Sequence, residues 1–161
     1  YPIRASGQAA LFMLDIDNFK KYNDFYGHLK GDDCLRRIAA TFKKAFAGHN
    51  GYVIRYGGEE FIAVVFLVER KLTLELGDKI CRLVENEALP DAEGGVVTVS
   101  IGMCHIQSTV DVSLSECIRI ADKALYQAKT SGKNRAVMLD APQQAPGAAA
   151  QQGISDSTPM G

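Results

Sequence analysis

Several features are absent from this 161-residue sequence. No apolar run approaches the eighteen or so residues of a transmembrane helix, and the N-terminus lacks a basic-then-apolar signal pattern. The 18 basic and 19 acidic residues leave a formal net charge of -1, so no bulk positive charge favours nucleic acid or an anionic membrane as a partner. Any binding of phosphate must therefore be local.

Cysteines at metal-binding spacing are also missing. The four cysteines, at positions 34, 81, 104 and 117, form no Cys-x-x-Cys pair, and no histidine lies at zinc-finger spacing from them. Most fall within apolar periodic segments, which indicates buried, reduced thiols, although a disulfide stays open as an alternative. We therefore expect a cytoplasmic domain, whether or not the full-length protein is anchored to a membrane.

The hydrophobic pattern predicts a single α+β domain over residues 1–140. Apolar runs and alternation predict strands at residues 10–14, 52–54, 61–66, 97–103 and 136–139, the fourth with one buried and one exposed face. Apolar spacings of three and four predict helices at residues 19–25, from after residue 33 to about 48, around 76–84, and at 114–128. From residue 141 to 161 the composition turns to Ala, Gln, Pro, Gly and Ser, which predicts a disordered tail.

Two local signals refine this plan. Asp17 or Asn18 is a candidate cap for the first helix. The pair Gly57 and Gly58, between two strands, is expected to supply the positive backbone angles of a tight hairpin.

Acidic residues follow two of the predicted strands. Asp15 and Asp17 come after the first strand, and Glu59 and Glu60 come after the Gly-Gly turn. Two strand ends can converge, and Mg²⁺ usually takes one or two protein carboxylates while leaving positions for water and substrate phosphates. Since isolated acidic residues at turns are commonly just solvated, this spacing alone leaves a metal site and a solvated turn as alternatives.

The hairpin carries a longer pattern. Residues 55–61 read Arg-Tyr-Gly-Gly-Glu-Glu-Phe and resemble the signature of the Gly-Gly-Asp-Glu-Phe (GGDEF) family, in its Glu variant. Residues 15–32, 100–102, 121–129 and 132–135 are similar to the family's other motifs, in register over about residues 9–139. The resemblance implies a ferredoxin-like, nucleotidyl-cyclase palm fold, in which helices flank a central, mainly antiparallel five-stranded sheet.

The resemblance also implies an activity, that of a diguanylate cyclase. Such an enzyme condenses two GTP into cyclic di-GMP and two pyrophosphates, by metal-assisted attack of a ribose 3'-hydroxyl on an α-phosphate in a dimer of half-sites. The implied partners are GTP, Mg²⁺ or Mn²⁺, a second copy of the domain and an upstream sensor domain. Nucleic acid is not among them.

Carried over residue by residue, the resemblance assigns the catalytic centre. Asp15 and Glu59 would hold the metals through their side chains, assisted by the carbonyl of Ile16. Glu60 is the neighbouring acid, with a role as base or metal neighbour. The glycines at positions 57 and 58 would let the substrate approach the backbone.

Asn23 and Asp32 match the family's guanine-binding pair. A carboxylate can accept from both N1–H and N2–H of guanine, donors that adenine does not offer. Capping of the second helix by Asp32 stays as the structural alternative.

Basic residues and backbone amides match the family's phosphate contacts. Lys129 and Lys133 correspond to two triphosphate ligands, the second of which is often Arg in the family. The backbone amides of Asn18 and Phe19, at the start of the first helix, would cradle phosphate.

The sequence departs from the family pattern in two places. The family's opening segment, which couples a sensor to the catalytic unit, is not matched by the first residues, so we expect a domain truncated at its N-terminus. Gly48 and Gly51 stand where an inhibitory product-binding Arg and Asp are usual, which predicts escape from the usual product inhibition. A non-catalytic receptor for GTP or cyclic di-GMP, and a cyclase of altered base specificity, are the alternative functions.

Overall fold

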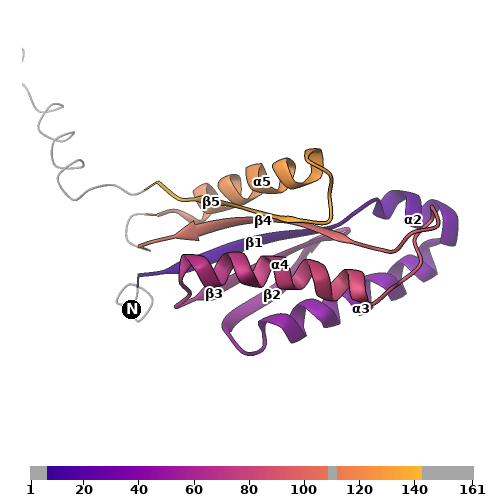
Figure 1. Ribbon diagram of the computed structural model, residues 1–161, viewed down its shortest axis with the longest axis horizontal. Coiled ribbons are helices and arrows are strands. Elements are labelled where there is room, and N and C mark those ends of the chain that lie inside the picture. Colours follow the sequence, from indigo (N-terminus) through magenta and orange to yellow (C-terminus); the bar gives the residue numbers. More distant parts are fainter. Residues whose placement is uncertain (1–6, 109–111, 143–161) are drawn as a thin grey trace, which may run out of the picture.

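The apolar runs assemble into one sheet in the computed structural model, which describes residues 7–108 and 112–142. The elements in chain order are β1 (Ala9–Ile16), α2 (Phe19–Tyr26), α3 (His28–Phe46), β2 (Asn50–Gly57), β3 (Glu60–Phe66), α4 (Arg70–Asn86), β4 (Val99–Ile106), α5 (Leu114–Thr130) and β5 (Ala136–Asp140). Figure 1 shows the strands as a twisted layer, with α2 and the start of α3 beyond one end of it.

The five strands lie in the order β2-β3-β1-β4-β5, so β1 is central. It is antiparallel to both neighbours, β2 is antiparallel to β3, and β5 runs parallel to β4. This confirms the predicted α+β class and the mainly antiparallel sheet. The acidic end of β1 consequently lies between the ends of β3 and β4.

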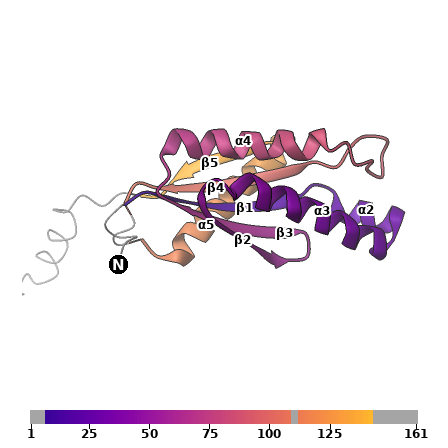
Figure 2. The ribbon, with the colours of Figure 1, turned by 90° about the horizontal axis from the view of Figure 1, so that it is seen from below.

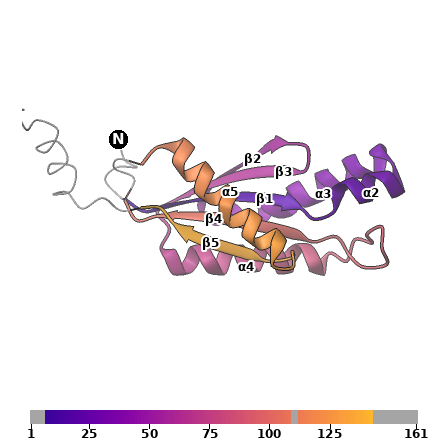
Figure 3. The ribbon, with the colours of Figure 1, turned by 90° about the horizontal axis from the view of Figure 1, so that it is seen from above.

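Helices cover both faces of the sheet. α3 and α4 pack on one face and α5 crosses the other, as the two turned views show (Figures 2 and 3). Alternate residues of β1 serve the two sides, since Phe12 and Leu14 belong to the core under α3 and α4, while Leu11 and Met13 belong to the core under α5. The continuous apolar run of β1 therefore reflects burial on both faces.

β4 is also buried on both faces, and the prediction of a half-buried strand was wrong. All eight of its residues are buried. Gly102 explains how α5 comes so close, because an added Cβ there would overlap the backbone of Ala121 and Leu125. Alternation of Gly and Ser with apolar residues in this strand marks close helix packing instead of exposure to solvent.

The second helix starts earlier than predicted. α3 begins at His28, so Asp32 lies inside the helix and the capping interpretation of this residue was wrong. The early turn is possible because Gly31 faces Asn23 of α2, and an added Cβ would overlap the Asn23 side chain. Close approach of α2 and α3 therefore sets the position of Asp32.

The two local turn predictions hold only in part. Asn18 occupies the N-cap position of α2 with a φ of 55°, but its side chain makes no capping hydrogen bond to this helix. In the hairpin, Gly58 has the positive φ, of 53°, whereas Gly57 belongs to β2 and pairs with Glu60. The signature turn thus consists of Gly58 and Glu59.

The remaining expectations concern the cysteines and the chain ends. All four cysteines are buried and free. Ala141, predicted to open the disordered tail, packs in the core under α5, and its backbone N–H donates to the His105 carbonyl oxygen at 2.9 Å. Residues 143–161 of that predicted tail lie outside the described residues. Within residues 7–108 and 112–142, no helix has the length and apolar character that crossing a bilayer requires.

Candidate active site

The structure brings the acidic residues of the two strand ends together. Asp15 is directly opposite Glu60 of β3 and, on its other side, Ser100 of β4. The Ile16 N–H donates to the carbonyl oxygen of Glu59 at 3.3 Å, which fixes the signature turn against the end of β1. Both glutamates are half-buried. The antiparallel register therefore places every predicted metal-binding residue at one end of the sheet. This end, with Asp15, the Ile16 carbonyl, Glu59 and Glu60, is called the acidic edge.

Asp15 has an unusual environment for a carboxylate. Its side chain is 2% exposed, and its Oδ2 pairs with the Lys129 ammonium. Burial raises the pKa of Asp15 to about 6. The hydrogen bond and charge of Lys129 act to lower this pKa, and the charges of Glu59 and Glu60 act to raise it. Its second oxygen, Oδ1, is buried with no hydrogen-bond partner among the described residues. A buried, unpartnered carboxylate oxygen of this kind favours an additional positively charged ligand.

Lys129 reaches this carboxylate from the last turn of α5. Burial acts to lower its pKa, but the hydrogen bond and charge of Asp15, followed by the charges of Glu60 and Glu59, outweigh that effect and raise the pKa. Lys129 is therefore a charged group held against the acidic edge.

Asp17, predicted from the sequence only as an acid or a helix cap, accepts hydrogen bonds from several segments around the end of β1. The Asp17 carboxylate accepts from Ser100 Oγ at 2.6 Å, from Thr98 Oγ1 at 2.8 Å and from the Asn134 backbone N–H at 3.0 Å. It thereby joins the end of β1 to β4 and to the loop that follows α5. Thr98 just before β4, Ser100 within it and the loop Gly-Lys-Asn-Arg lie far from Asp17 in the sequence, so no local pattern indicated this contact.

The same loop brings Lys133 to the start of α2. Lys133 has a φ of 62°, and its Nζ donates to Asn18 Oδ1 at 2.6 Å. Phe19, the next residue, is buried as the first residue of α2. The two predicted phosphate-binding lysines therefore flank the same end of β1 from the α5 side.

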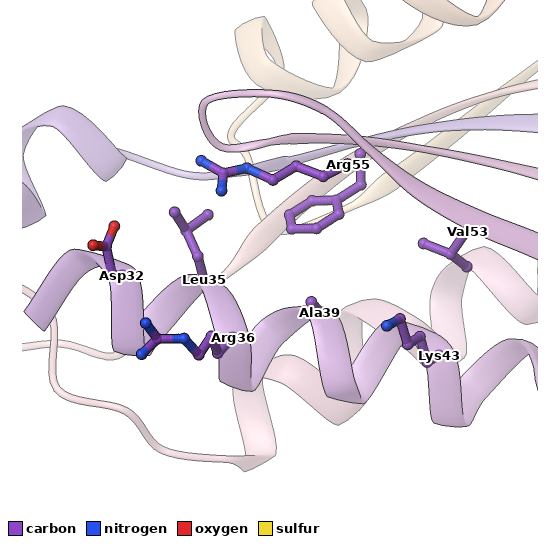
Figure 4. A pocket seen from close by; sticks show the side chains of 8 residues that line it. Asp32, Leu35, Arg36, Ala39, Lys43, Val53 and Arg55 are labelled. Carbon is purple, nitrogen blue, oxygen red and sulfur yellow. The ribbon is translucent and has the colours of Figure 1, made fainter.

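A cavity of about 400 Å³ opens between α3 and β2, next to the signature hairpin. Its lining combines one carboxylate, three cations and four apolar residues (Figure 4): Asp32, Arg36, Lys43, Arg55, Leu35, Ala39, Val53 and Phe61. Asp32 is thus placed on a cavity, as a guanine contact requires. Asn23 is not among these lining residues. Its Oδ1 is buried between α2 and α3 without a hydrogen-bond partner in the described part of the chain.

The described residues contain no ready-made cluster of three or more metal-ligating side chains. The acidic edge nevertheless fits Mg²⁺ or Mn²⁺, because Asp15 presents a buried unpartnered oxygen beside the half-buried Glu59 and Glu60. A cation that keeps water and substrate phosphates as ligands needs no more than one or two protein carboxylates.

Residues 3–135 match the family model described as "Diguanylate cyclase, GGDEF domain". The chain is a GGDEF domain. It is 38% identical over 133 residues to diguanylate cyclase DgcZ of Escherichia coli K12, covering 81% of this chain and 43% of that protein. This GGDEF domain spans less than half the length of the curated relatives that it matches.

Solved structures agree with this assignment. The active GGEEF domain of a diguanylate cyclase from Vibrio cholerae has a TM-score of 0.73 and 29% identity, covering 89% of this GGDEF domain and 94% of that chain. The GGDEF domain of DgcB from Caulobacter crescentus, solved in complex with c-di-GMP, has a TM-score of 0.75 and 30% identity, covering 83% and 79% of the two chains. The expected palm-like fold is therefore confirmed.

Replacing Asp17 with Ala should lower the free energy of unfolding by about 3 kcal/mol, because it removes charge-assisted hydrogen bonds and leaves the buried Ser100 hydroxyl without its acceptor. Urea denaturation measures this change. The matched control is Asp24→Ala on the exposed side of α2, which should change stability by less than about 0.5 kcal/mol. Equal urea midpoints for the two variants would show that Asp17 does not hold the edge together.

Proposed function

We propose that this domain is a diguanylate cyclase that forms cyclic di-GMP from two GTP. The observation that carries the proposal is the buried Asp15, with one oxygen paired to Lys129 and the other unpartnered, beside the signature glutamates. The Asp32 cavity on the neighbouring hairpin adds a place for a base. Carboxylates and a lysine at the end of β1, with a base-sized cavity beside the signature hairpin, suit metal-assisted nucleotidyl transfer.

Asp15 and Glu59, with the Ile16 carbonyl, are the proposed metal ligands. Bound Mg²⁺ or Mn²⁺ would supply charge neutralisation at the triphosphate and a lowered pKa for the attacking 3'-hydroxyl. The Asp15 Oδ1, which has no hydrogen-bond partner among the described residues, is the acceptor that this assignment uses, and the Lys129 ammonium balances the charge of Asp15 until substrate arrives. Glu60 lies directly opposite Asp15, where it can accept a proton or support a metal ligand.

The triphosphate is assigned to the surrounding donors. Lys129 and Lys133 bring positive charge from α5 and the loop after it, and the backbone amides of Asn18 and Phe19 lie at the start of α2. Gly58, exposed in the signature turn, leaves room beside the backbone. Binding of phosphate by a few fixed donors accounts for anion binding in a chain with a net charge of -1.

The guanine base is assigned to Asp32 on α3, with Asn23 as its proposed partner. Asp32 lines the cavity and is exposed to it, so its carboxylate can accept from the guanine N1–H and N2–H groups. Retention of this carboxylate favours GTP over ATP as the substrate.

Product analysis after incubation with Mg²⁺ tests the activity directly. The parent chain should convert GTP, and not ATP, to a cyclic dinucleotide, and Glu59→Gln should lower turnover by roughly 100-fold or more, since even groups that only support metal ligands are worth 10- to 100-fold. The control is Glu75→Gln on the exposed side of α4, and this variant should have the same turnover as the parent. Parent protein that binds GTP but forms no product would establish the receptor alternative, and a fully active Glu59→Gln variant would show that the wrong carboxylate is assigned.

We also propose that two domains face each other during catalysis, because one site of this kind holds one GTP and the second GTP must be presented by another copy. An upstream sensor domain in the full-length protein and a cytoplasmic location of this domain complete the proposal. Specific activity should fall as the protein is diluted. Activity per molecule that stays constant over a thousandfold dilution, to concentrations where only monomer sediments, would contradict the half-site model.

The positions of the usual inhibitory residues support weak product inhibition. Gly48 lies in the turn after α3, and Gly51 lies on β2, so neither offers a guanidinium or a carboxylate. Loss of two charged contacts of about 1.5–3 kcal/mol each should raise the product concentration needed for inhibition from micromolar to roughly millimolar. Initial rates with added cyclic di-GMP measure this. Saturable inhibition at low micromolar product that GTP cannot relieve would reveal a separate inhibitory site.

A further inference from the structure

The rim of the α3–β2 cavity carries a carboxylate and a guanidinium side by side. Asp32 and Arg36 are four residues apart on α3, so they lie on the same face, about 6 Å apart along the helix axis. In Figure 4 the guanidinium groups of Arg36 and Arg55 lie at the Asp32 end of the cavity. Leu35 and Phe61 are among the apolar residues that form the floor, which suits the face of a flat base.

Guanine has two groups of polar atoms that differ in their hydrogen-bonding role. Its N1–H and N2–H groups are donors, and its O6 and N7 atoms are acceptors. The proposed function assigns the donor edge to Asp32 and assigns no residue to the acceptors. In protein–DNA recognition, a guanidinium that donates two parallel hydrogen bonds to O6 and N7 is the commonest specific contact to guanine. The rim of the cavity offers a guanidinium beside Asp32.

We propose that Arg36 is a specificity-determining residue that donates to O6 and N7 of the GTP base while Asp32 accepts from its other edge. This inference rests on the proposed function, because it concerns the base of the same substrate. Adenine carries an amino group where guanine has O6, so the Arg36 guanidinium would face a donor and reject adenine. Asp32 and Arg36 then discriminate against ATP from both sides of the ring.

The contacts of the three cations single out Arg36. Arg55 is held by its Nε, which donates to the Gly58 carbonyl oxygen at 2.9 Å. Lys43 lies eleven residues from Asp32, roughly 16 Å along the helix, and offers a point charge instead of a fork. Arg36 pairs with Asp33 at 2.7 Å, but both side chains are at least 70% exposed, and such surface pairs contribute little. Arg36 can therefore exchange this partner for a base at little cost.

Equilibrium binding in the presence of Mg²⁺ tests the inference, with the nucleotides supplied as their 3'-deoxy forms, which cannot react because they lack the attacking hydroxyl. The ligands are GTP and 7-deaza-GTP, which lacks the N7 acceptor and keeps both donors. The parent should prefer GTP, and Arg36→Ala should weaken GTP binding by roughly 5- to 100-fold and remove the preference over 7-deaza-GTP. Arg36→Lys, which keeps the charge without the fork, should also lower the preference.

Two further variants provide matched comparisons. Asp32→Ser should weaken the binding of GTP and 7-deaza-GTP by the same factor and keep the parent's preference for GTP, because Asp32 does not contact N7. Arg37→Ala removes the same charge from the neighbouring position on α3, where the side chain pairs with Glu87, just after α4, so both affinities should stay at the parent's values. Urea midpoints close to that of the parent establish that each variant is folded.

The outcomes separate this inference from the proposed activity. If Arg36→Ala and Arg36→Lys weaken the binding of both nucleotides equally, or of neither, Arg36 does not contact N7 of the base. The inference then falls even where the parent makes cyclic di-GMP. If the preference follows Arg36 but the parent forms no product, the proposed activity falls and the recognition stands. A parent that binds neither nucleotide overturns both.

Discussion

The ion pair between Asp15 and Lys129 is the interaction on which the rest of the site depends. It joins the end of the central strand to the last turn of α5, two elements far apart in the chain. An almost fully buried carboxylate is costly unless a positive charge accompanies it, and Lys129 supplies that charge while Asp15 Oδ1 has no partner in the described part of the chain. The end of β1 therefore combines a neutralised buried charge with a carboxylate oxygen that accepts no hydrogen bond from the described residues.

Asp17 supports this arrangement from the other side of the strand end. Its three hydrogen bonds hold β4 and the loop after α5 in place, and that loop carries Lys133 to the start of α2. Asp15 in β1 and Asp17 just after the strand thus differ although they are two residues apart. Asp15 Oδ1 has no hydrogen-bond partner among the described residues, whereas both carboxylate oxygens of Asp17 accept hydrogen bonds.

The α3–β2 cavity depends on a different constraint, the close packing of α2 on α3. Gly31 makes room for the Asn23 side chain between the helices, which allows α3 to begin at His28 and to carry Asp32 and Arg36 on one face. The signature hairpin closes the cavity from β2, where Arg55 braces the turn through the Gly58 carbonyl. The cavity and the acidic edge are linked because the signature hairpin contributes Arg55 and Phe61 to the cavity and Glu59 and Glu60 to the acidic edge.

The sequence by itself determined the family, the number and type of elements and the residues of the acidic edge, because the Gly-Gly-Glu-Glu-Phe turn and the apolar run before Asp15 are local patterns. It could not show that β4 is buried on both faces, that Asp32 lies within a helix, or that Asp17 bonds to Ser100 and Asn134. Those facts depend on helix packing at glycines and on contacts across more than 80 residues. Only the tertiary structure decides them, since periodicity reports the environment of a segment and not the identity of its neighbours.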